Sequence, residues 1–376
     1  AGCFCTPAKA DYRGAAQLTG SALNAFNLSL LTYPYHPSKH TGRGHDRYVA
    51  ELIDNITSQR DDVRLKVVDH GFSKNVLAGG LKLPRQVLDM LREHANVYNA
   101  ISPVGGATAA LLGKGPLVVT IHDVIPFNLS GSLDSPLKYR IWRQCIRLCL
   151  KRAAAIVVPY HVTKDYLIQQ LGTDPAKIHV VNYGVDHGVY FQRPELERVK
   201  RRVLYVGEVA RSKGVEVLLR AFAEVQKRVP DAELLIGGKR AKDQPLLEEL
   251  ARSLNIENLS FLGFIPESDL ADHYRKTTVM VFPSHCGFGL STLEAMACGT
   301  PVVGVKALDA PEFFADAGLL AEPDNVPELA DCLARVLESR ELQGELNKKS
   351  LARAELFSWA RTARETADVY SKVARG

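Results

Sequence analysis

Short runs of aliphatic and β-branched residues alternate with helical patterns along nearly the whole chain, and this alternation constrains the fold more than any other feature. It is typical of parallel sheets covered by helices, because a parallel strand must be followed by a long crossover connection. In the first half the runs that predict strands are Leu28–Thr32, Leu65–Val68, Val97–Asn99, Leu117–Ile121, Ala155–Val158 and Ile178–Val181. The second half repeats the rhythm with RRVLYVG, AELLIGG, LSFLGF, VMVFPS, PVVGV and GLLAEP.

The length and the charge pattern predict two domains. A chain of 376 residues exceeds the usual size of one hydrophobic core. The stretch Gln192–Arg202 is charged and has no apolar period, so it is the best candidate for a linker, with the boundary near Phe191. The predicted organisation is a loose N-terminal extension at 1–27, an N-terminal domain at 28–190, a C-terminal domain at 191–355 and a crossover helix at 356–376.

Composition excludes several classes of protein. A net charge of +5 without a basic cluster that is interleaved with aromatic residues gives no argument for a nucleic-acid partner. No apolar run reaches the ~18 residues of a membrane-spanning helix, and residues 1–27 lack the pattern of a signal peptide. Seven cysteines without framework spacing fit free thiols and a cytoplasmic protein.

One strand-to-helix loop in the second half combines glycines with cations. The segment GEVARSKG follows a predicted strand, begins at Gly207 and leads to a helix that opens at Gly214. Its two cations are Arg211 and Lys213. A helix start presents unpaired N–H groups and the positive end of the helix dipole, so this loop suits a diphosphate. Solvated basic residues at a helix start are the alternative interpretation.

A second loop, HCGFGLSTLEAMACG, follows VMVFPS and leads into a helix that carries Glu294. Gly287 and Gly289 allow backbone amides to approach a ligand closely, and the amides of Phe288–Ser291 can face a phosphate. Glu294 lies about one turn into the helix and could accept hydrogen bonds from two adjacent ribose hydroxyls. A surface carboxylate that complements the helix dipole is the alternative for this residue.

Two further segments of the first half fall at strand ends. In VVTIHDVIPF, His122 and Asp123 follow a predicted strand directly, where ligands of open α/β sheets bind. The segment HPSKHTGRGHDRY follows the first strand and has glycines at 42 and 44 ahead of a helix, which predicts another anion-binding loop.

The order and wording of these segments are similar to family 4 of the retaining glycosyltransferases, which have the two-domain GT-B fold. The similarity covers nearly everything from Leu28 to the C-terminus, and it is carried by YPYHPSKHTGRGHDRY, TIHDVIPF, VVNYGVD, YVGEVARSKGVEVLLRAF, FLGFIPESDLADHYR, FPSHCGFGLSTLEAMACGTPVV and APEFFADAGLL. It implies an α/β fold of two Rossmann-like domains facing a central cleft, with a C-terminal helix that crosses back to the N-terminal domain.

The resemblance also implies a function. It implies transfer of a sugar from a nucleotide diphosphate sugar to a glycan, lipid-linked or small-molecule acceptor, with retention of configuration and without a metal or another cofactor. The implied catalytic residues are His122 at the donor sugar and Glu294 at the ribose. Matching positions imply donor-binding roles for Gly44, Gly207, Arg211, Lys213, Phe264, Ile265, Cys286, Gly287, Phe288, Gly289, Leu290, Ser291 and Glu294. Among these, Phe264 and Ile265 match the contact to the base.

The chain departs from the family pattern at two positions. Glu208 stands where the family usually has Arg, so we expect Arg211 to supply the second cation. Cys286 stands at the first Glu of the family's Glu-x7-Glu pattern, which ends at Glu294. A neutral thiol cannot accept hydrogen bonds as a carboxylate does. The alternative function is therefore a nucleotide-sugar-binding protein with weak or no transferase activity.

The segment 138–152 carries Arg140, Arg143, Arg147 and Lys151 along one helical side. This side could contact an anionic membrane, where a lipid-linked acceptor would reside, and the protein would then lie at the inner membrane face. A merely solvated face is the other interpretation.

Overall fold

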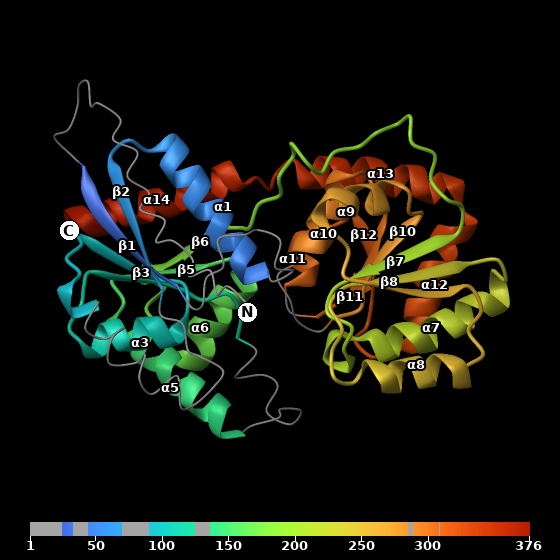
Figure 1. Cartoon of the computed structure of the whole chain (residues 1–376), viewed down its shortest axis with the longest axis horizontal. Coiled ribbons are helices and arrows are strands. Elements are labelled where there is room, and N and C mark those ends of the chain that lie inside the picture. The colour runs from blue at the N-terminus through green and yellow to red at the C-terminus, as the bar shows by residue number, and fades with distance from the viewer. Residues whose placement is uncertain (1–24, 33–43, 70–89, 125–135, 285–288, 308) are drawn as a thin grey trace, which may run out of the picture.

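The computed structural model describes residues 25–32, 44–69, 90–124, 136–284, 289–307 and 309–376. Within these ranges it contains two sheets of six parallel strands (Figure 1). The first has the order β2-β1-β3-β4-β5-β6, with β1 at Phe26–Thr32, β2 at Val63–Asp69, β3 at Val97–Ala100, β4 at Leu117–Thr120, β5 at Ala155–Val158 and β6 at Ile178–Val180. The second has the order β12-β11-β10-β7-β8-β9, with β7 at Arg202–Val206, β8 at Glu233–Gly237, β9 at Leu259–Gly263, β10 at Val279–Phe282, β11 at Val302–Val305 and β12 at Gly318–Ala321.

Helices cover both faces of the first sheet. One face packs on α3, α5 and α6, and the other packs on α1 and the C-terminal helix α14 (Figure 1). The bounds are α1 Gly44–Gln59, α3 Pro103–Leu111, α5 Pro136–Arg152, α6 His161–Leu171, the short 3-10 helix η2 Pro175–Lys177, and α14 Trp359–Arg375. This three-layer arrangement is the one that parallel strands require, because their crossover helices must lie on the sheet.

The second sheet is covered in the same way. Helices α7, α8 and α12 pack on one face, and α9, α10 and α13 on the other. The bounds are η3 Arg211–Lys213, α7 Val215–Arg228, α8 Gln244–Ser253, α9 Glu267–Arg275, α10 Leu290–Ala297, α11 Ala310–Phe314, α12 Val326–Glu338 and α13 Arg340–Ala354. The apolar residues of α7 recur at the spacing of one helical face, and the structure buries that face. Val215, Leu218, Leu219, Phe222 and Val225 are buried within the helix, and Val229 is buried at its C-cap.

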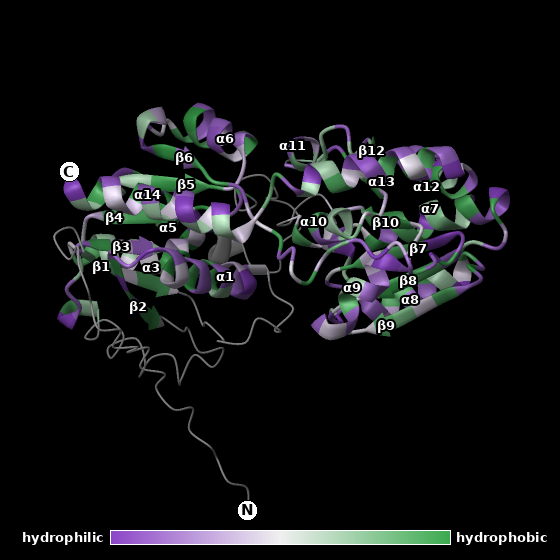
Figure 2. Cartoon of the chain, turned by 90° about the horizontal axis from the view of Figure 1, so that it is seen from above, coloured by the Kyte–Doolittle hydropathy of each residue, from purple (hydrophilic) through white to green (hydrophobic). Residues whose placement is uncertain are grey.

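All twelve strands predicted from apolar runs are present, and the interior strands show why these runs are apolar. Strands β3, β4, β5 and β11 are buried along their whole length, as expected for strands covered on both faces. Figure 2 shows the strands of the first sheet mostly in the colour of hydrophobic residues, and the helices with alternating polar and apolar residues. Several boundaries differ from the prediction by one or two residues, and the largest differences are at the starts of β1 and β2. β1 begins at Phe26, two residues before Leu28, because Phe26 is buried and its N–H bonds to Asp62.

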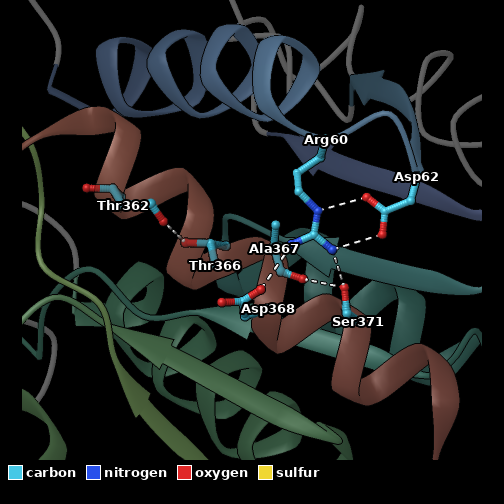
Figure 3. A network of polar contacts seen from close by, with 7 residues as sticks. All are labelled: Arg60, Asp62, Thr362, Thr366, Ala367, Asp368 and Ser371. Carbon is cyan, nitrogen blue, oxygen red and sulfur yellow. Dashed lines mark hydrogen bonds and ion pairs between the residues drawn. The ribbon is translucent and has the colours of Figure 1, made fainter.

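The C-terminal helix α14 crosses back onto the first sheet, as predicted. It lies beside α1 and next to β3 and β5. Arg60, just past the end of α1, forms ion pairs with Asp62 at 2.7 Å and with Asp368 on α14 at 3.0 Å. It also donates a hydrogen bond to the Ser371 hydroxyl on α14 at 2.8 Å (Figure 3). The start of α14 also packs closely on the segment that follows β6. A Cβ atom at Gly184 would lie 2.1 Å from the backbone nitrogen of Trp359, so only glycine fits there.

The fold is therefore the predicted one, two Rossmann-like halves with a returning C-terminal helix. The domain limits at 27/28, 190/191 and 355/356 stay predictions. None of the helices in the described ranges has the length and apolarity needed to cross a membrane.

Candidate functional site

Most of the predicted site residues follow interior strands of the two sheets, whereas Phe264 and Ile265 follow the edge strand β9. In the first sheet the strand order reverses between β1 and β3, and in the second between β7 and β10. Ligands of open parallel sheets bind outside the carboxyl ends of the strands at such reversals. The segments that leave these ends include α1 after β1, His122 after β4, η3 after β7 and α10 after β10. The halves meet through contacts of α1 and α6 with α9, α10 and α11.

Glu294 lies on α10 and is almost fully buried, with 5% of its surface exposed. The Tyr274 hydroxyl donates a hydrogen bond to its carboxylate at 2.9 Å, and the Arg47 guanidinium donates another. Burial raises the pKa of Glu294, although Arg47 and Tyr274 act in the opposite direction. The side chain is thus not a surface acid that only complements the helix dipole. It is a buried acceptor with two fixed donors.

Arg47, on the first turns of α1, joins the two halves here, and it was not among the predicted site residues. Besides Glu294 it forms an ion pair with Glu267 on α9. It also donates to the Tyr190 hydroxyl at 3.0 Å and lies over the Tyr190 ring at 5.4 Å. A guanidinium suits this place because its planar fork can serve several acceptors at once. The only sequence signal was its position in the helix that follows the glycines of TGRGHDRY.

His122 lies beside the next residue of α1. Its Nδ1 is 2.9 Å from the Tyr183 hydroxyl, and the Tyr48 ring stands edge-on to it at 4.9 Å. The ring of His45 is 5.7 Å away. Burial lowers the pKa of His122 well below its usual value, and His45 lowers it further. His122 is therefore a neutral imidazole at neutral pH. Through Arg47 and Tyr48, one turn of α1 contacts both residues that were predicted to be catalytic.

Glycine packing brings the loops after β7, β8 and β10 together. Gly207 donates to the carbonyl of Gly237 at 3.0 Å, and a Cβ on Gly238 would lie 1.7 Å from the carbonyl oxygen of Gly207. Gly214 has φ 74°, and a Cβ there would lie 2.0 Å from the carbonyl oxygen of Pro283. The loop with Arg211 and Lys213 therefore lies directly against the segment that precedes residues 285–288.

The two cations of this loop have different surroundings. The Arg211 guanidinium is exposed and pairs with Glu216 at 2.7 Å, and its backbone N–H bonds to Asp243 at 2.8 Å. Lys213 is half-buried beside Gly214. Arg211 thus has a carboxylate partner on α7, and its contact with the donor diphosphate stays a prediction.

The other predicted donor-binding residues lie near the same loops. Gly289 is the N-cap of α10 and has a φ of 65°. A Cβ atom added at this position would lie 3.0 Å from the ring of Phe313. Ile265 is buried against Gly237, whereas Phe264 is 52% exposed. Leu290 and Ser291 form the first turn of α10, and Gly44 begins α1. Cys286, Gly287 and Phe288 lie outside the described residues.

A second contact between the halves caps α6. Its N-cap, Tyr160, makes no side-chain cap bond. The carboxylate of Glu312 on α11 instead accepts hydrogen bonds from the N–H of His161 at 2.7 and 3.0 Å and of Val162 at 3.3 Å. A carboxylate at a helix N-terminus is stabilised by the helix dipole.

Asp309 lies in the same region, just before α11. Burial raises its pKa to about 7, and the neighbouring charges of Asp123 and Glu312 act in the same direction. In the part of the chain that the structure describes, no group of three or more His, Cys, Asp or Glu side chains is arranged to hold a metal ion.

Comparisons with known proteins agree with this architecture. Residues 40–189 match the family model described as "Glycosyltransferase Family 4", and residues 200–339 match the one described as "Glycosyl transferases group 1". A D-inositol 3-phosphate glycosyltransferase of Nocardioides sp. is 30% identical over 333 residues, which cover 80% of this chain and 71% of that protein. The chain belongs to the family 4, group 1 glycosyltransferases.

Coverage differs among the relatives. A D-inositol 3-phosphate glycosyltransferase of Corynebacterium kroppenstedtii is 31% identical over 289 residues, which cover 70% of this chain and 63% of the relative. The match thus spans less than two thirds of that relative's length.

Solved structures with little sequence similarity share the fold. Sucrose-phosphate synthase from Thermosynechococcus elongatus has a TM-score of 0.80 at 20% identity, over 92% of this chain and 98% of that one. HepE from Anabaena, in complex with UDP-glucose, has a TM-score of 0.74 at 19% identity, over 92% of this chain and 100% of that one.

Proposed function

We propose that the chain transfers a glycosyl group from a nucleotide diphosphate sugar to an acceptor, with retention of configuration and without a metal ion. The observation that carries the proposal is the placement of Glu294 and His122 against consecutive residues of α1. A buried carboxylate acceptor and a neutral imidazole at the carboxyl ends of two parallel sheets suit ribose and sugar hydroxyls, respectively.

In this proposal the donor lies mainly on the C-terminal half. Glu294 accepts hydrogen bonds from the ribose, and the first-turn amides of α10 face the diphosphate. Lys213 and Arg211 stabilise the negative charge that grows on the leaving diphosphate. The Arg47 contact with Glu294 gives one further requirement. A ribose that uses the carboxylate must share it with Arg47 or displace it, so donor binding and the position of α1 are coupled.

In this proposal, retention of the anomeric configuration determines the course of the transfer. The acceptor hydroxyl approaches the anomeric carbon on the face from which the diphosphate leaves. The C–O bond to the diphosphate breaks as the new C–O bond forms, and a leaving phosphate oxygen takes the hydroxyl proton. His122, neutral because of its burial, donates or accepts a hydrogen bond at the donor sugar and holds it near the reacting centre.

The similar proteins indicate which donors and acceptors to test first. The HepE complexes contain UDP-glucose or UDP, so UDP sugars come first in a donor panel, followed by GDP and ADP sugars. The names of the relatives make an inositol phosphate the first soluble acceptor to test.

We also propose that the protein is cytoplasmic and that α5 contacts an anionic membrane. Arg140, Arg147 and Lys151 are exposed on this helix, and Ile141 beside them is 55% exposed.

The test is donor turnover, measured as nucleotide diphosphate release and product formation, with EDTA and with Mn²⁺. Turnover that EDTA leaves intact and product with the donor's anomeric configuration would support the proposal. Activity abolished by EDTA and restored by Mn²⁺ would contradict metal independence. An inverted product would contradict retention. Tight binding of a nucleotide sugar with no turnover across the panel would favour the nucleotide-sugar-binding alternative.

A further inference from the structure

The two hydrogen-bond donors of the Glu294 carboxylate belong to different halves of the molecule (Figure 1). Arg47 reaches Oε1 from α1, whereas the Tyr274 hydroxyl donates to Oε2 at 2.9 Å from α9, which packs beside α10 in the same half. Glu294 is 5% exposed with Arg47 in place, so a ribose gains access to the carboxylate as Arg47 shifts. The contact with Arg47 therefore depends on how the halves are placed, whereas the contact with Tyr274 lies within one half.

The Tyr274 side chain is fixed by its surroundings. It is fully buried, and its ring lies 6.1 Å from that of Tyr190. Its carbonyl accepts hydrogen bonds from the Thr300 hydroxyl at 2.7 Å and from the Thr277 N–H at 3.1 Å. Burial raises the pKa of Tyr274 well above its usual value, and the charge of Glu294 acts in the same direction. The hydroxyl is therefore protonated at neutral pH and donates to the carboxylate.

The carboxylate of Glu294 has acceptor sites left over. A carboxylate has about four lone-pair sites, two on each oxygen. Tyr274 uses one site on Oε2, and Arg47 uses one on Oε1. Each oxygen thus keeps at least one site whether Arg47 stays or leaves, and two adjacent ribose hydroxyls need one site on each. A glutamate side chain has several rotatable bonds, so without a fixed donor its orientation must be restricted when the ribose binds, at a cost in entropy.

We propose that Tyr274 is a positioning residue for the nucleotide donor, because it holds Glu294 in the orientation that serves both ribose hydroxyls. This inference rests on the proposed function, in which Glu294 binds the ribose. It adds that the site selects nucleotides that carry both hydroxyls, and that the selection depends on a buried side chain that acts only through Glu294.

The test is calorimetric titration of the wild type and of Tyr274→Phe with UDP and with 2′,3′-dideoxy-UDP, which lacks both ribose hydroxyls. The substitution removes one oxygen and keeps the ring. We expect it to weaken UDP binding about tenfold, since the hydrogen bonds to a charged group lose their fixed acceptor, and to change dideoxy-UDP binding less than about twofold. Equal weakening of both nucleotides would indicate a merely structural role and overturn the proposal. Unchanged UDP affinity would overturn it as well.

Tyr98→Phe is the matched control. Tyr98 is also buried, and its hydroxyl donates to the carbonyl of Glu93 at 2.8 Å in the N-terminal half. This variant should bind both nucleotides within about twofold of the wild type. The wild type separates this inference from the proposed function. If it prefers GDP or ADP, the matching pair with that base is used. If it binds none of the three diphosphates, the proposed function itself fails, whereas a wild type that binds UDP tests Tyr274 alone.

The pH dependence of binding supplies a readout that a structural role would not move. The charged and titratable groups around Glu294 come from several segments: Arg47 on α1, Glu267 and Tyr274 on α9, Tyr190, and Cys298 on α10. Burial raises the pKa of Glu294, and Arg47 and Tyr274 act against this shift. Loss of the Tyr274 hydroxyl should therefore raise the pKa of Glu294 further.

The ratio of UDP affinity to dideoxy-UDP affinity cancels the titration of the phosphates and reports on Glu294. This ratio should fall as pH drops through the pKa of the carboxyl, because a protonated carboxyl has fewer acceptor sites. We expect the fall at a higher pH in Tyr274→Phe than in the wild type. Identical profiles for the two proteins would overturn the proposal.

Discussion

Arg47 pairs with two carboxylates of the other half, the buried Glu294 and the half-buried Glu267. Removing it takes the guanidinium away from the buried Glu294 charge in a poorly hydrated place. We therefore expect Arg47→Ala to lower the free energy of unfolding by about 3–5 kcal/mol. Arg47→Lys should recover only part of this loss, because an ammonium cannot reproduce the fork that also reaches Tyr190. Urea unfolding measures both effects.

Arg64 provides a matched control for this prediction. It is an exposed arginine of the same half, so Arg64→Ala should change the free energy of unfolding by no more than about 0.5 kcal/mol. If Arg47→Ala were as mild as Arg64→Ala, the ion pairs with α9 and α10 would not describe the protein in solution.

Cys286 decides between the two functions considered for this chain. If the loop around it keeps the shape of the family, Cys286→Glu places a carboxylate beside the donor sugar, and transfer or donor hydrolysis should rise by about tenfold. Affinity for the free diphosphate should barely change, because sugar and diphosphate contact different groups. If the loop is instead built around a small residue, the variant should lose several kcal/mol of stability and gain no activity. Turnover in Cys286→Glu but none in the wild type would identify a disabled transferase.

At the scale of elements, η3 and the start of α7 form the predicted diphosphate loop. Charged hydrogen bonds are worth about 1.5–3 kcal/mol each, so Arg211→Ala/Lys213→Ala should weaken nucleotide diphosphate binding at least about tenfold more than nucleoside binding. Because Arg211 pairs with Glu216, we expect Lys213→Ala alone to give the larger share. Equal losses for nucleotide and nucleoside, measured by calorimetry, would remove these cations from the site.

Elements with a local signal could be predicted from the sequence. The β-branched runs gave all twelve strands, and the apolar spacing gave the buried face of α7. Gly289 was expected to allow close approach, and it has a positive φ at the start of α10. These features depend on residues within a few positions of one another, which is why pattern reasoning finds them. The exact start of β1 was missed because it depends on a backbone bond from Phe26 to Asp62.

Contacts between distant elements left no such signal. Arg47 and Glu294 are 247 residues apart, and Glu312 caps a helix 151 residues before it. An arginine near a helix start or a glutamate in a short helix is compatible with many partners, so only the folded arrangement selects one. The sequence therefore predicted which loops follow the carboxyl ends of the strands, but not that α1 contacts both candidate catalytic residues.

At the scale of the whole molecule, the two halves are joined by more than a linker. One hydrophobic cluster is continuous from Tyr48 and Val157 in the first half to Met296 and Phe313 in the second. The rings of Tyr160 and Phe313 meet at 5.7 Å beside the Glu312 cap of α6. Apolar contact and a charged cap thus hold the halves in the arrangement that places His122 and Glu294 against α1.

This junction should be sensitive to pH through Asp309, whose pKa burial raises to about 7 and which also faces the charges of Asp123 and Glu312. A carboxyl with a raised pKa stabilises the fold fully only below its unfolded pKa, and the contribution is lost as pH rises through 7. Asp309→Asn stays neutral at every pH. Its free energy of unfolding relative to the wild type should therefore increase by about 2–3 kcal/mol between pH 5 and pH 8. The control Asp316→Asn, on an exposed loop residue, should show no such trend. A flat difference for Asp309→Asn would mean that this carboxyl stays ionised at the junction.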